Sequence, residues 1–309
     1  MTWKHAAHKH FNLFSEINLD SEKAGDELES LFSSTDCIDE IKPEFMHITA
    51  EAAVHIVRKD QKNFEENDVA AFKNAVNKLI QDGIYNDLVG FHADMSHNMH
   101  GSMGPIGLLR FLGWHRRYLL AFEEALQNAD RLLRPEAETL ISVPYWRWVD
   151  PFPEWLQEFL PFPDPRTGGP VPPRTLSGPE LKPSSSDIDF IINSFEQQLP
   201  GSNVDGYTKF TYGLEGFGRR SDNSRLPAHN QIHAWVGGIM NDTSYSPSDP
   251  VFWLHHAEVD RLWHIWQKQH PDLHPALTGN DSIMDPWTES YNQLGSITML
   301  GYSYQSESL

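Results

Sequence analysis

The chain has 309 residues, 39% of them hydrophobic, so it is long and apolar enough to bury a sizeable core. This composition excludes a disordered or collagen-like chain, and the absence of any run of about 18 apolar residues argues against a membrane span. The 43 acidic residues outnumber the 24 basic ones, and the net charge of −19 argues against nucleic acid or an anionic membrane as a partner.

Residues 1–66 are mixed and acidic, and we expect them to precede or pack on a domain formed by residues 67–309. The chain starts without the apolar stretch of a secretory signal, so a cytoplasmic location is expected. The single cysteine, Cys37, excludes an internal disulfide framework and a zinc site built on cysteines. Histidine, in contrast, occurs 16 times. Because histidine is the commonest metal-ligating side chain, the question is which of these histidines converge.

Apolar residues at helical spacing predict two helices in the first half of this domain. The first covers residues 67–82, where Asn67 or Asp68 can cap the start and Gly83 ends the helix. The second covers residues 108–131, in which leucine and phenylalanine recur near helical spacing.

Four histidines lie in or before this second helix. His92 is expected to end the preceding helix, and His115 lies on the second helix among apolar neighbours. His97 and His100 fall in the glycine-containing loop between them, and either one can complete a set of three histidines.

The second half of the chain contains a long irregular segment and a further helix. Residues 151–183 hold ten of the 21 prolines, which excludes a regular helix or a central strand and predicts a long loop wrapped on one domain. Asp249 and Pro250 form a strong helix start, and the helix is expected to run to about Trp266. Because strand signals are few and short, we predict a mainly α fold built on a helical bundle.

A second histidine cluster lies on either side of that helix start. His229 and His233 are four residues apart, so on a helix their rings lie on one face and can share one metal ion. His255 and His256 are adjacent and point about 100° apart, so only one can face a given metal. His256 shares the apolar stripe of the helix and is predicted to be the ligand, while Asp260 is placed to orient a ligand or to pair with an arginine.

The two clusters provide two sets of three histidines. No Glu-x-x-His pairing of the di-iron bundles is present, and no two-histidine, one-carboxylate arrangement is evident. Three imidazoles can hold a catalytic zinc ion, but two such sets suit a pair of copper ions better, since copper has high affinity for nitrogen ligands.

Several long motifs resemble the tyrosinase family of type 3 copper proteins. Residues 111–119 (FLGWHRRYL) and 248–263 (SDPVFWLHHAEVDRLW) resemble its two copper signatures, and residues 229–238 (HNQIHAWVGG) match the intervening one. Residues 143–148 (VPYWRW) are similar to the PYWDW element, with Arg147 in place of the acid. The resemblance covers roughly residues 85–303 and implies a single domain in which a central four-helix bundle holds a dinuclear copper site, with long proline-rich loops and few short strands.

In that family each copper ion is bound by three histidines. Carried over, the first copper takes His92, His100 and His115, and the second takes His229, His233 and His256. The middle ligand of the first site departs from the commonest spacing, because Ile106 stands nine residues before His115; the residues around His100 resemble members with a longer loop and favour His100 over His97. No cysteine lies near either histidine, so the thioether cross-link of some members cannot form.

The resemblance implies oxidation of small phenols by dioxygen: ortho-hydroxylation of monophenols and oxidation of o-diphenols to o-quinones. In similar bacterial members a glutamate and an asparagine hold a water that acts on the phenol; Glu215 and Asn230 match these positions. Two alternatives remain open, a catechol oxidase with diphenolase activity only and an oxygen carrier similar to molluscan hemocyanin. The carrier is disfavoured because the residues after Trp266 are too few for the domain that shields its copper pair.

Overall fold

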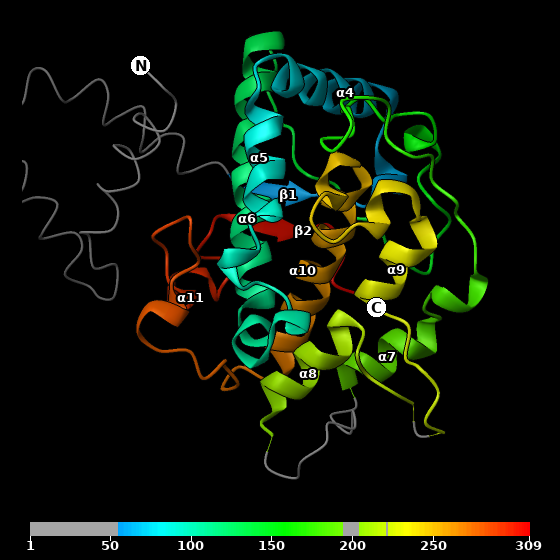
Figure 1. The fold of residues 1–309 in the computed structure, drawn as a ribbon. Coiled ribbons are helices and arrows are strands. Elements are labelled where there is room, and N and C mark those ends of the chain that lie inside the picture. Colours follow the sequence, from blue (N-terminus) through cyan, green and yellow to red (C-terminus); the bar gives the residue numbers. More distant parts are fainter. Residues whose placement is uncertain (1–54, 194–203, 221) are drawn as a thin grey trace, which may run out of the picture. The chain divides into compact units, whose positions relative to one another are not determined.

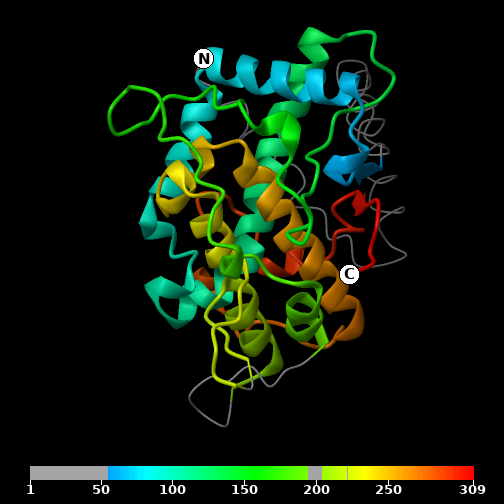
Figure 2. The same ribbon diagram turned by 90° about the vertical axis from the view of Figure 1, so that its right-hand side faces the viewer.

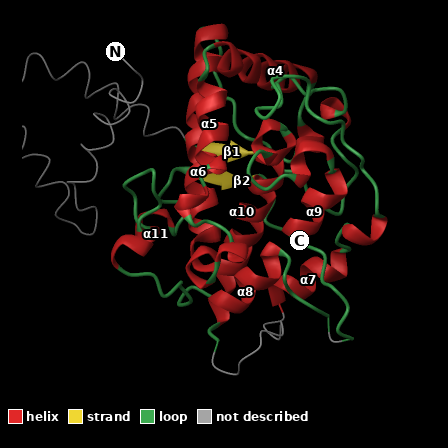
Figure 3. Ribbon diagram, in the orientation of Figure 1, coloured by secondary structure: helices red, strands yellow, loops and turns green. Residues whose placement is uncertain are grey.

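The computed structural model describes residues 55–193, 204–220 and 222–309, and a compact unit spans His55–Leu309. Most of its regular structure is helical, as predicted (Figure 3). Residues 1–54 of the predicted N-terminal extension lie outside the described residues, whereas its last part belongs to the compact unit. The elements are β1 (Ile56–Arg58), α4 (Glu66–Gln81), α5 (Ile84–Ala93), α6 (Pro105–Leu133), α7 (Ser185–Asn193), α8 (Gly206–Glu215), α9 (His229–Val236), α10 (Val251–Gln269), α11 (Tyr291–Leu294) and β2 (Tyr302–Tyr304).

The first predicted helix corresponds to α4, but its cap differs from the expectation. Glu65, not Asn67 or Asp68, is the residue before the first turn. The Glu65 backbone N–H donates to the Asp68 carboxylate at 3.2 Å, so Asp68 stabilises the start of the helix from its third position. Gly83, with φ of 78°, ends the helix and lets the chain turn into α5.

Helix α6 is the central element of the fold (Figure 1). It extends beyond the predicted 108–131 at both ends and begins at Pro105, a residue whose fixed φ suits the first helical position. Helices α4, α8 and α10 all pack against it. Because neighbours cover it on several sides, most of its side chains are buried, including charged ones such as Arg116 and Glu123.

Helix α10 packs beside α6 through large aromatic side chains. The rings of Phe122 on α6 and Trp253 on α10 stack with centroids 3.9 Å apart. The predicted start of α10 is confirmed within one residue: Pro250 precedes the first turn, and the Asp249 carboxylate accepts a hydrogen bond from the Val251 N–H at 2.9 Å. Viewed from the side, α6 and α10 form the middle of the helical body (Figure 2).

The proline-rich segment lies on the bundle as a loop. Of residues 151–183 only two short turns are helical, which confirms the predicted lack of regular structure. The Thr175 N–H donates to the Val236 carbonyl at 2.8 Å, and Arg174 forms an ion pair with Asp249 at 2.7 Å. This hydrogen bond and this ion pair connect the loop to the end of α9 and the start of α10.

Two short strands join the start and the end of the compact unit. β1 and β2 pair in parallel, with Ile56 opposite Tyr302 and Arg58 opposite Tyr304. Arg58 is fully buried beneath this pair and forms ion pairs with Glu123 on α6 and Asp260 on α10. Segments far apart in the sequence are therefore joined to the two central helices.

Candidate metal centre

Helices α5 and α6 and the loop between them bring the first three histidines together. Nε2 of His92, in the last turn of α5, lies 3.4 Å from Nε2 of His100 and 3.4 Å from Nε2 of His115. All three imidazoles are buried. The predicted position of His92 at the end of the preceding helix is confirmed.

A glycine on α6 permits the close approach of His100. A Cβ atom at Gly107 would lie 2.1 Å from the His100 carbonyl oxygen, closer than real atoms come. Only glycine lets the backbone that carries His100 lie against α6 at this point. No local sequence pattern marks Gly107, because its role depends on how the loop folds back on the helix.

Helices α9 and α10 supply the second set. Nε2 of His229 lies 3.2 Å from Nε2 of His233 and 3.2 Å from Nε2 of His256. The predicted placement of the first two one turn apart on the same helix is confirmed. The two sets adjoin, because the rings of His115 and His256 stack with their centroids 4.4 Å apart.

Hydrogen bonds on the outer ring nitrogens show that these sets fit a metal. His115 Nδ1 donates to the Phe111 carbonyl at 2.8 Å, so its Nε2 carries a lone pair that points at His92. His233 Nδ1 donates to the Met240 carbonyl at 2.8 Å, so its Nε2 lone pair points into the second set. Lone pairs that face one another repel unless a cation lies between them, and neutral imidazoles are donors that copper binds tightly.

Burial keeps these imidazoles neutral. Desolvation lowers the pKa of His233 to about 4, and desolvation with neighbouring imidazoles holds the pKa of His92 and His256 well below the usual value. The same causes lower the pKa of His115 and His229. At neutral pH each of these five rings therefore offers a lone pair rather than a positive charge.

His255 and Asp260 both lie near the second set. His255 offers a ring nitrogen within 4.8 Å of those of His229, His233 and His256, so the structure brings four histidines together here. The His255 ring is buried between His229, His233 and Trp148, and neither of its nitrogens has a hydrogen-bond partner within the described residues. Asp260, one turn beyond His256, pairs with Arg116 and Arg58 rather than with an imidazole. The sequence predicted that Asp260 either orients a ligand or pairs with an arginine, and the structure confirms the pairing with arginine.

The structure separates His97 from the first set. His97 Nδ1 lies 2.5 Å from an Asp285 carboxylate oxygen, and Arg110 pairs with the other oxygen of the same carboxylate. The His97 ring also stacks on Trp114. Of the two loop histidines, only His100 lies beside His92 and His115.

A hollow of about 200 Å³, here called the histidine hollow, opens onto both sets. Its walls include His92, His100, His229 and His233, together with Glu215, Phe217, Asn230 and Met240. Glu215 is 1% exposed and accepts hydrogen bonds from the Gly101 N–H at 2.8 and 3.0 Å. Burial raises its pKa, although His100 and Gly101 counteract the shift. Asn230 Oδ1 lies 3.0 Å from His229 Nδ1. Glu215 and Asn230, the two residues predicted to act on the phenol, therefore line the same hollow as the histidines.

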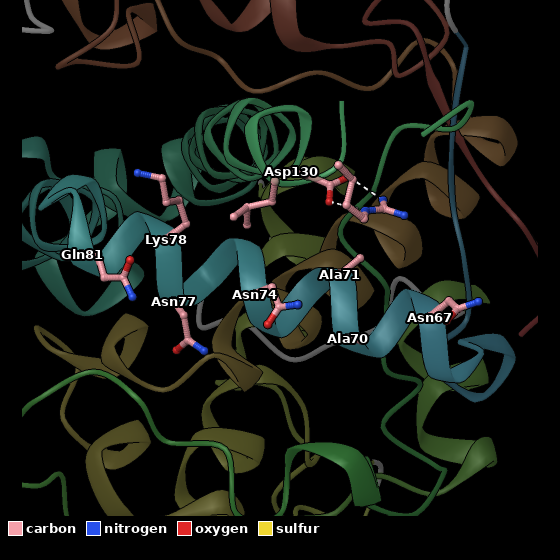
Figure 4. Close-up of a pocket in the computed structure, with 10 residues that line it drawn as sticks. Asn67, Ala70, Ala71, Asn74, Asn77, Lys78, Gln81 and Asp130 are labelled. Carbon is pink, nitrogen blue, oxygen red and sulfur yellow. Dashed lines mark hydrogen bonds and ion pairs between the residues drawn. The ribbon is translucent and has the colours of Figure 1, made fainter. Parts of the chain in front are cut away.

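A larger hollow of about 530 Å³ lies away from the histidines, along α4 and the end of α6 (Figure 4). Amide side chains of Asn67, Asn74, Asn77 and Gln81 line it, beside an ion pair of Asp130 with Arg134. None of its lining residues is a histidine. This polar groove offers no metal ligand set, so the chemistry of the described chain is centred on the histidine hollow.

The fold and the site together define a class of protein. It is a mainly α protein in which helices α5, α6, α9 and α10 bring two adjoining sets of histidines together for a pair of metal ions. A family model described as the common central domain of tyrosinase matches residues 82–180 and 165–269. Tyrosinase of Streptomyces galbus is 33% identical over 270 residues, which cover 75% of this chain and 93% of that protein. The chain belongs to the tyrosinase family, so it is a copper-dependent phenol oxidase whose cofactor is a dinuclear copper centre.

Further relatives share the sequence or the fold. Grixazone synthase of Streptomyces griseus is 27% identical over 279 residues, which cover 70% of this chain and 86% of that protein. A functional unit of octopus hemocyanin superposes with a TM-score of 0.57 at 20% identity, over 82% of this chain and 69% of that one. This last likeness shows a common fold alone. Among the described residues, no helix combines the length and the apolar character needed to cross a bilayer.

Proposed function

We propose that this protein hydroxylates monophenols next to their hydroxyl group and oxidises the resulting diphenols to o-quinones. In this proposal the first copper is bound by His92, His100 and His115, and the second by His229, His233 and His256. When bound, the copper pair supplies the binding and activation of dioxygen. The observation that carries the proposal is that the histidine hollow joins both imidazole sets to Glu215 and Asn230.

Glu215 and Asn230 are proposed to remove the phenol proton by way of a water. Hydroxylation needs a phenolate, and a phenol has a pKa of about 10, so a base beside the substrate lowers the barrier. A buried carboxylate whose pKa is raised is a stronger base than an exposed one. The Glu215 carboxylate accepts a hydrogen bond from the Gly101 N–H. The other lone pairs of its oxygens can accept hydrogen bonds from a water in the hollow.

The initial rates of the copper-loaded protein on a monophenol and its diphenol test this proposal. We expect both to be oxidised, and we expect Glu215→Gln and Asn230→Ala to lower monophenol turnover at least tenfold more than diphenol turnover. Glu215→Gln retains the size of the side chain and an acceptor for Gly101, so its copper content should stay unchanged. Equal losses on both substrates would contradict the base role.

Two alternative functions predict different outcomes of the same assay. A catechol oxidase would oxidise the diphenol and leave the monophenol untouched. An oxygen carrier would develop an oxygen-dependent absorption band without turning over either substrate; one relative is a hemocyanin unit of Helix pomatia, 26% identical over 69% of this chain. The histidine hollow, about 200 Å³ in the described part of the chain, has room for a phenol ring and favours an enzyme over a carrier.

A further inference from the structure

A second, apolar hollow adjoins the histidine hollow. It has a volume of about 350 Å³ and is lined mainly by carbon atoms, among them those of Pro105, Leu108, Tyr212 and Phe217. We call it the apolar hollow. Phe217 lines both hollows, so a single ring forms part of each wall.

The backbone after His100 forms the rest of the shared boundary. Gly101 lines the apolar hollow, while the next residue, Ser102, lines the histidine hollow. A Cβ atom at Gly101 would lie 2.9 Å from both Leu108 Cδ1 and Phe217 Cε2, so a glycine there lets these two side chains close in on the loop. The two hollows therefore meet at Phe217 and at the backbone of Gly101 and Ser102.

The aromatic side of the apolar hollow is built from two neighbouring rings. The centroids of Tyr212 and Phe217 lie 5.4 Å apart with 35° between the ring planes. Both residues are half-buried, so part of each ring remains available to a bound molecule. Such a wall stabilises alkyl and aryl groups by burying their surface.

The charges of the residues around the two hollows also favour an uncharged substrate over an anionic one. No lysine or arginine is among the described residues that line either hollow, and the one carboxylate, on Glu215, is negative when ionised. A substrate carboxylate would need a cation to replace its water. The net charge of −19 adds a long-range repulsion against anions.

We infer that the apolar hollow receives the group opposite the phenol hydroxyl, so that the preferred substrates are phenols and catechols with an uncharged, apolar para substituent. This inference rests on the proposed function, because it places the phenol ring in the histidine hollow. Phenols whose para substituent ends in a carboxylate are then poor substrates, since the apolar hollow, which would receive that carboxylate, offers it no cation.

The test compares kcat/KM along a series of catechols, using the protein loaded with two copper ions. The series runs from catechol through 4-methyl-, 4-ethyl-, 4-propyl- and 4-butylcatechol, with 3-(3,4-dihydroxyphenyl)propanoate as the charged counterpart of the last. We expect kcat/KM to rise about two- to fourfold per added carbon, as burial of a methylene group allows. We expect the carboxylate to react at least tenfold more slowly than 4-butylcatechol.

Variants separate the apolar hollow from the rest of the molecule. Leu108→Gln, which changes a residue of the apolar hollow alone, should flatten the dependence on chain length while turnover of unsubstituted catechol changes little. Phe217→Ala, which changes both walls, should flatten the dependence when each rate is divided by that variant's own rate on catechol. Tyr212→Lys should raise kcat/KM for the carboxylate relative to 4-butylcatechol at least fivefold, by supplying the missing cation. Asn74→Ala, an exposed change in the polar groove on α4, is the matched control and should leave every ratio unchanged.

The unsubstituted catechol distinguishes failure of this inference from failure of the proposed function. If catechol is oxidised but kcat/KM does not depend on chain length, or if Phe217→Ala leaves the dependence intact, the inference is wrong and the proposed function stands. If protein with two copper ions does not oxidise catechol, the proposed function is wrong, and the inference falls with it.

Discussion

At His115 and His233, a backbone carbonyl determines which ring nitrogen is free for a metal. Each Nδ1 donates to a carbonyl at 2.8 Å, which fixes the tautomer and leaves Nε2 unprotonated. The sequence predicts the spacing of these histidines but not the acceptors. The Met240 carbonyl lies seven residues beyond His233, in a short turn after α9. The role of each imidazole as a copper ligand can be tested by replacing that histidine alone.

Replacement of His233 by alanine should remove one copper ion per chain and nearly all oxidase activity. Of the three proposed ligands only His229 and His256 would remain, and two ligands hold a copper ion far more weakly than three. Copper per chain is measured by atomic absorption after extensive dialysis. His274→Ala, which changes an exposed histidine outside both sets, should retain two copper ions. Two bound copper ions in the His233→Ala variant would refute the ligand assignment.

Acid should destabilise the metal-free protein through the same histidines. Burial lowers the pKa of His233 to about 4, whereas an exposed imidazole titrates near 6.5. Between these values the unfolded chain binds a proton that the folded protein excludes, so the free energy of unfolding decreases as the pH falls from about 6.5 towards 4. Thermal unfolding from pH 7.5 to 5 measures the slope, and His233→Phe should make it shallower. A Tm independent of pH over this range would contradict the prediction.

The choice between His97 and His100 shows where prediction from single residues stops. Both lie in one loop, and the chain's own motifs leave the choice open; only the resemblance to members with a longer loop favours His100. What decides their positions is distant in sequence: Asp285 holds His97, and Gly107 admits the backbone of His100. Only the resemblance to bacterial members indicates Glu215 in the sequence, whereas its burial and its bonds to Gly101 become visible only in the fold.

On the scale of elements, two helical glycines make a matched pair. Gly90 on α5 is exposed and has no atom within 4 Å of the position of a Cβ atom, whereas a Cβ atom at Gly107 on α6 would collide with the His100 carbonyl. In a helix, glycine to alanine ordinarily stabilises by up to about 1 kcal/mol. Gly90→Ala should therefore raise the Tm slightly and keep both copper ions. Gly107→Ala should displace His100 and lose one copper ion; a variant with full copper content would show that the loop can relax.

The pairing of β1 with β2 depends on a buried charge network beneath it. Asp260 on α10 accepts hydrogen bonds from Arg58, Arg116 and the hydroxyl of Tyr302 at 2.6 to 3.2 Å. Burial raises the pKa of Asp260, but Arg116, Arg58 and the Tyr304 hydroxyl outweigh it and lower the pKa below the usual value. The carboxylate therefore joins α10 to α6 and to both strands.

Removal of this carboxylate should loosen all four elements. Asp260→Ala leaves Arg116 buried without a carboxylate and Arg58 paired with Glu123 alone, and we expect the free energy of unfolding to fall by about 3–5 kcal/mol. Tyr304→Phe removes a single hydroxyl that also bonds to Asp260, so its cost should be about 1 kcal/mol. Denaturant unfolding of the copper-loaded variants measures both values. Equal effects of the two changes would show that the network is not what holds the strands.

Helices α4, α6 and α10 are predictable because each has a local signal, whereas α7, α8 and α11 were not predicted from the sequence. Periodic apolar residues and a cap locate α4, and Asp249 with Pro250 locates the start of α10. The ends of α6 were missed by two or three residues, since tertiary contacts rather than local preference extend it. The strand pair joins residues 246 positions apart, a contact that no local pattern indicates.

For the whole molecule, the six proposed ligands come from elements that only the folded chain brings together. His92 and His256 are separated by most of the domain, so the unfolded chain has no preformed site for copper. A ligand that binds only the folded state stabilises it, by about 4 kcal/mol when its free concentration is a thousand times its Kd. We therefore expect the Tm to rise when the metal-free protein is loaded with copper and to fall again with a chelator.

Combining copper loading with the His233→Ala variant makes this last prediction specific. If copper stabilises the fold through the two histidine sets, the variant should bind copper only at the first set, formed by α5, α6 and their loop. Its Tm should then rise by less than that of the unmodified protein. The exposed His274→Ala change should show the full increase. A variant that gains as much as the unmodified protein would mean that copper stabilises the fold from some other place on the molecule. An increase that vanishes altogether would mean that neither set binds without the other, as the stacking of His115 on His256 permits.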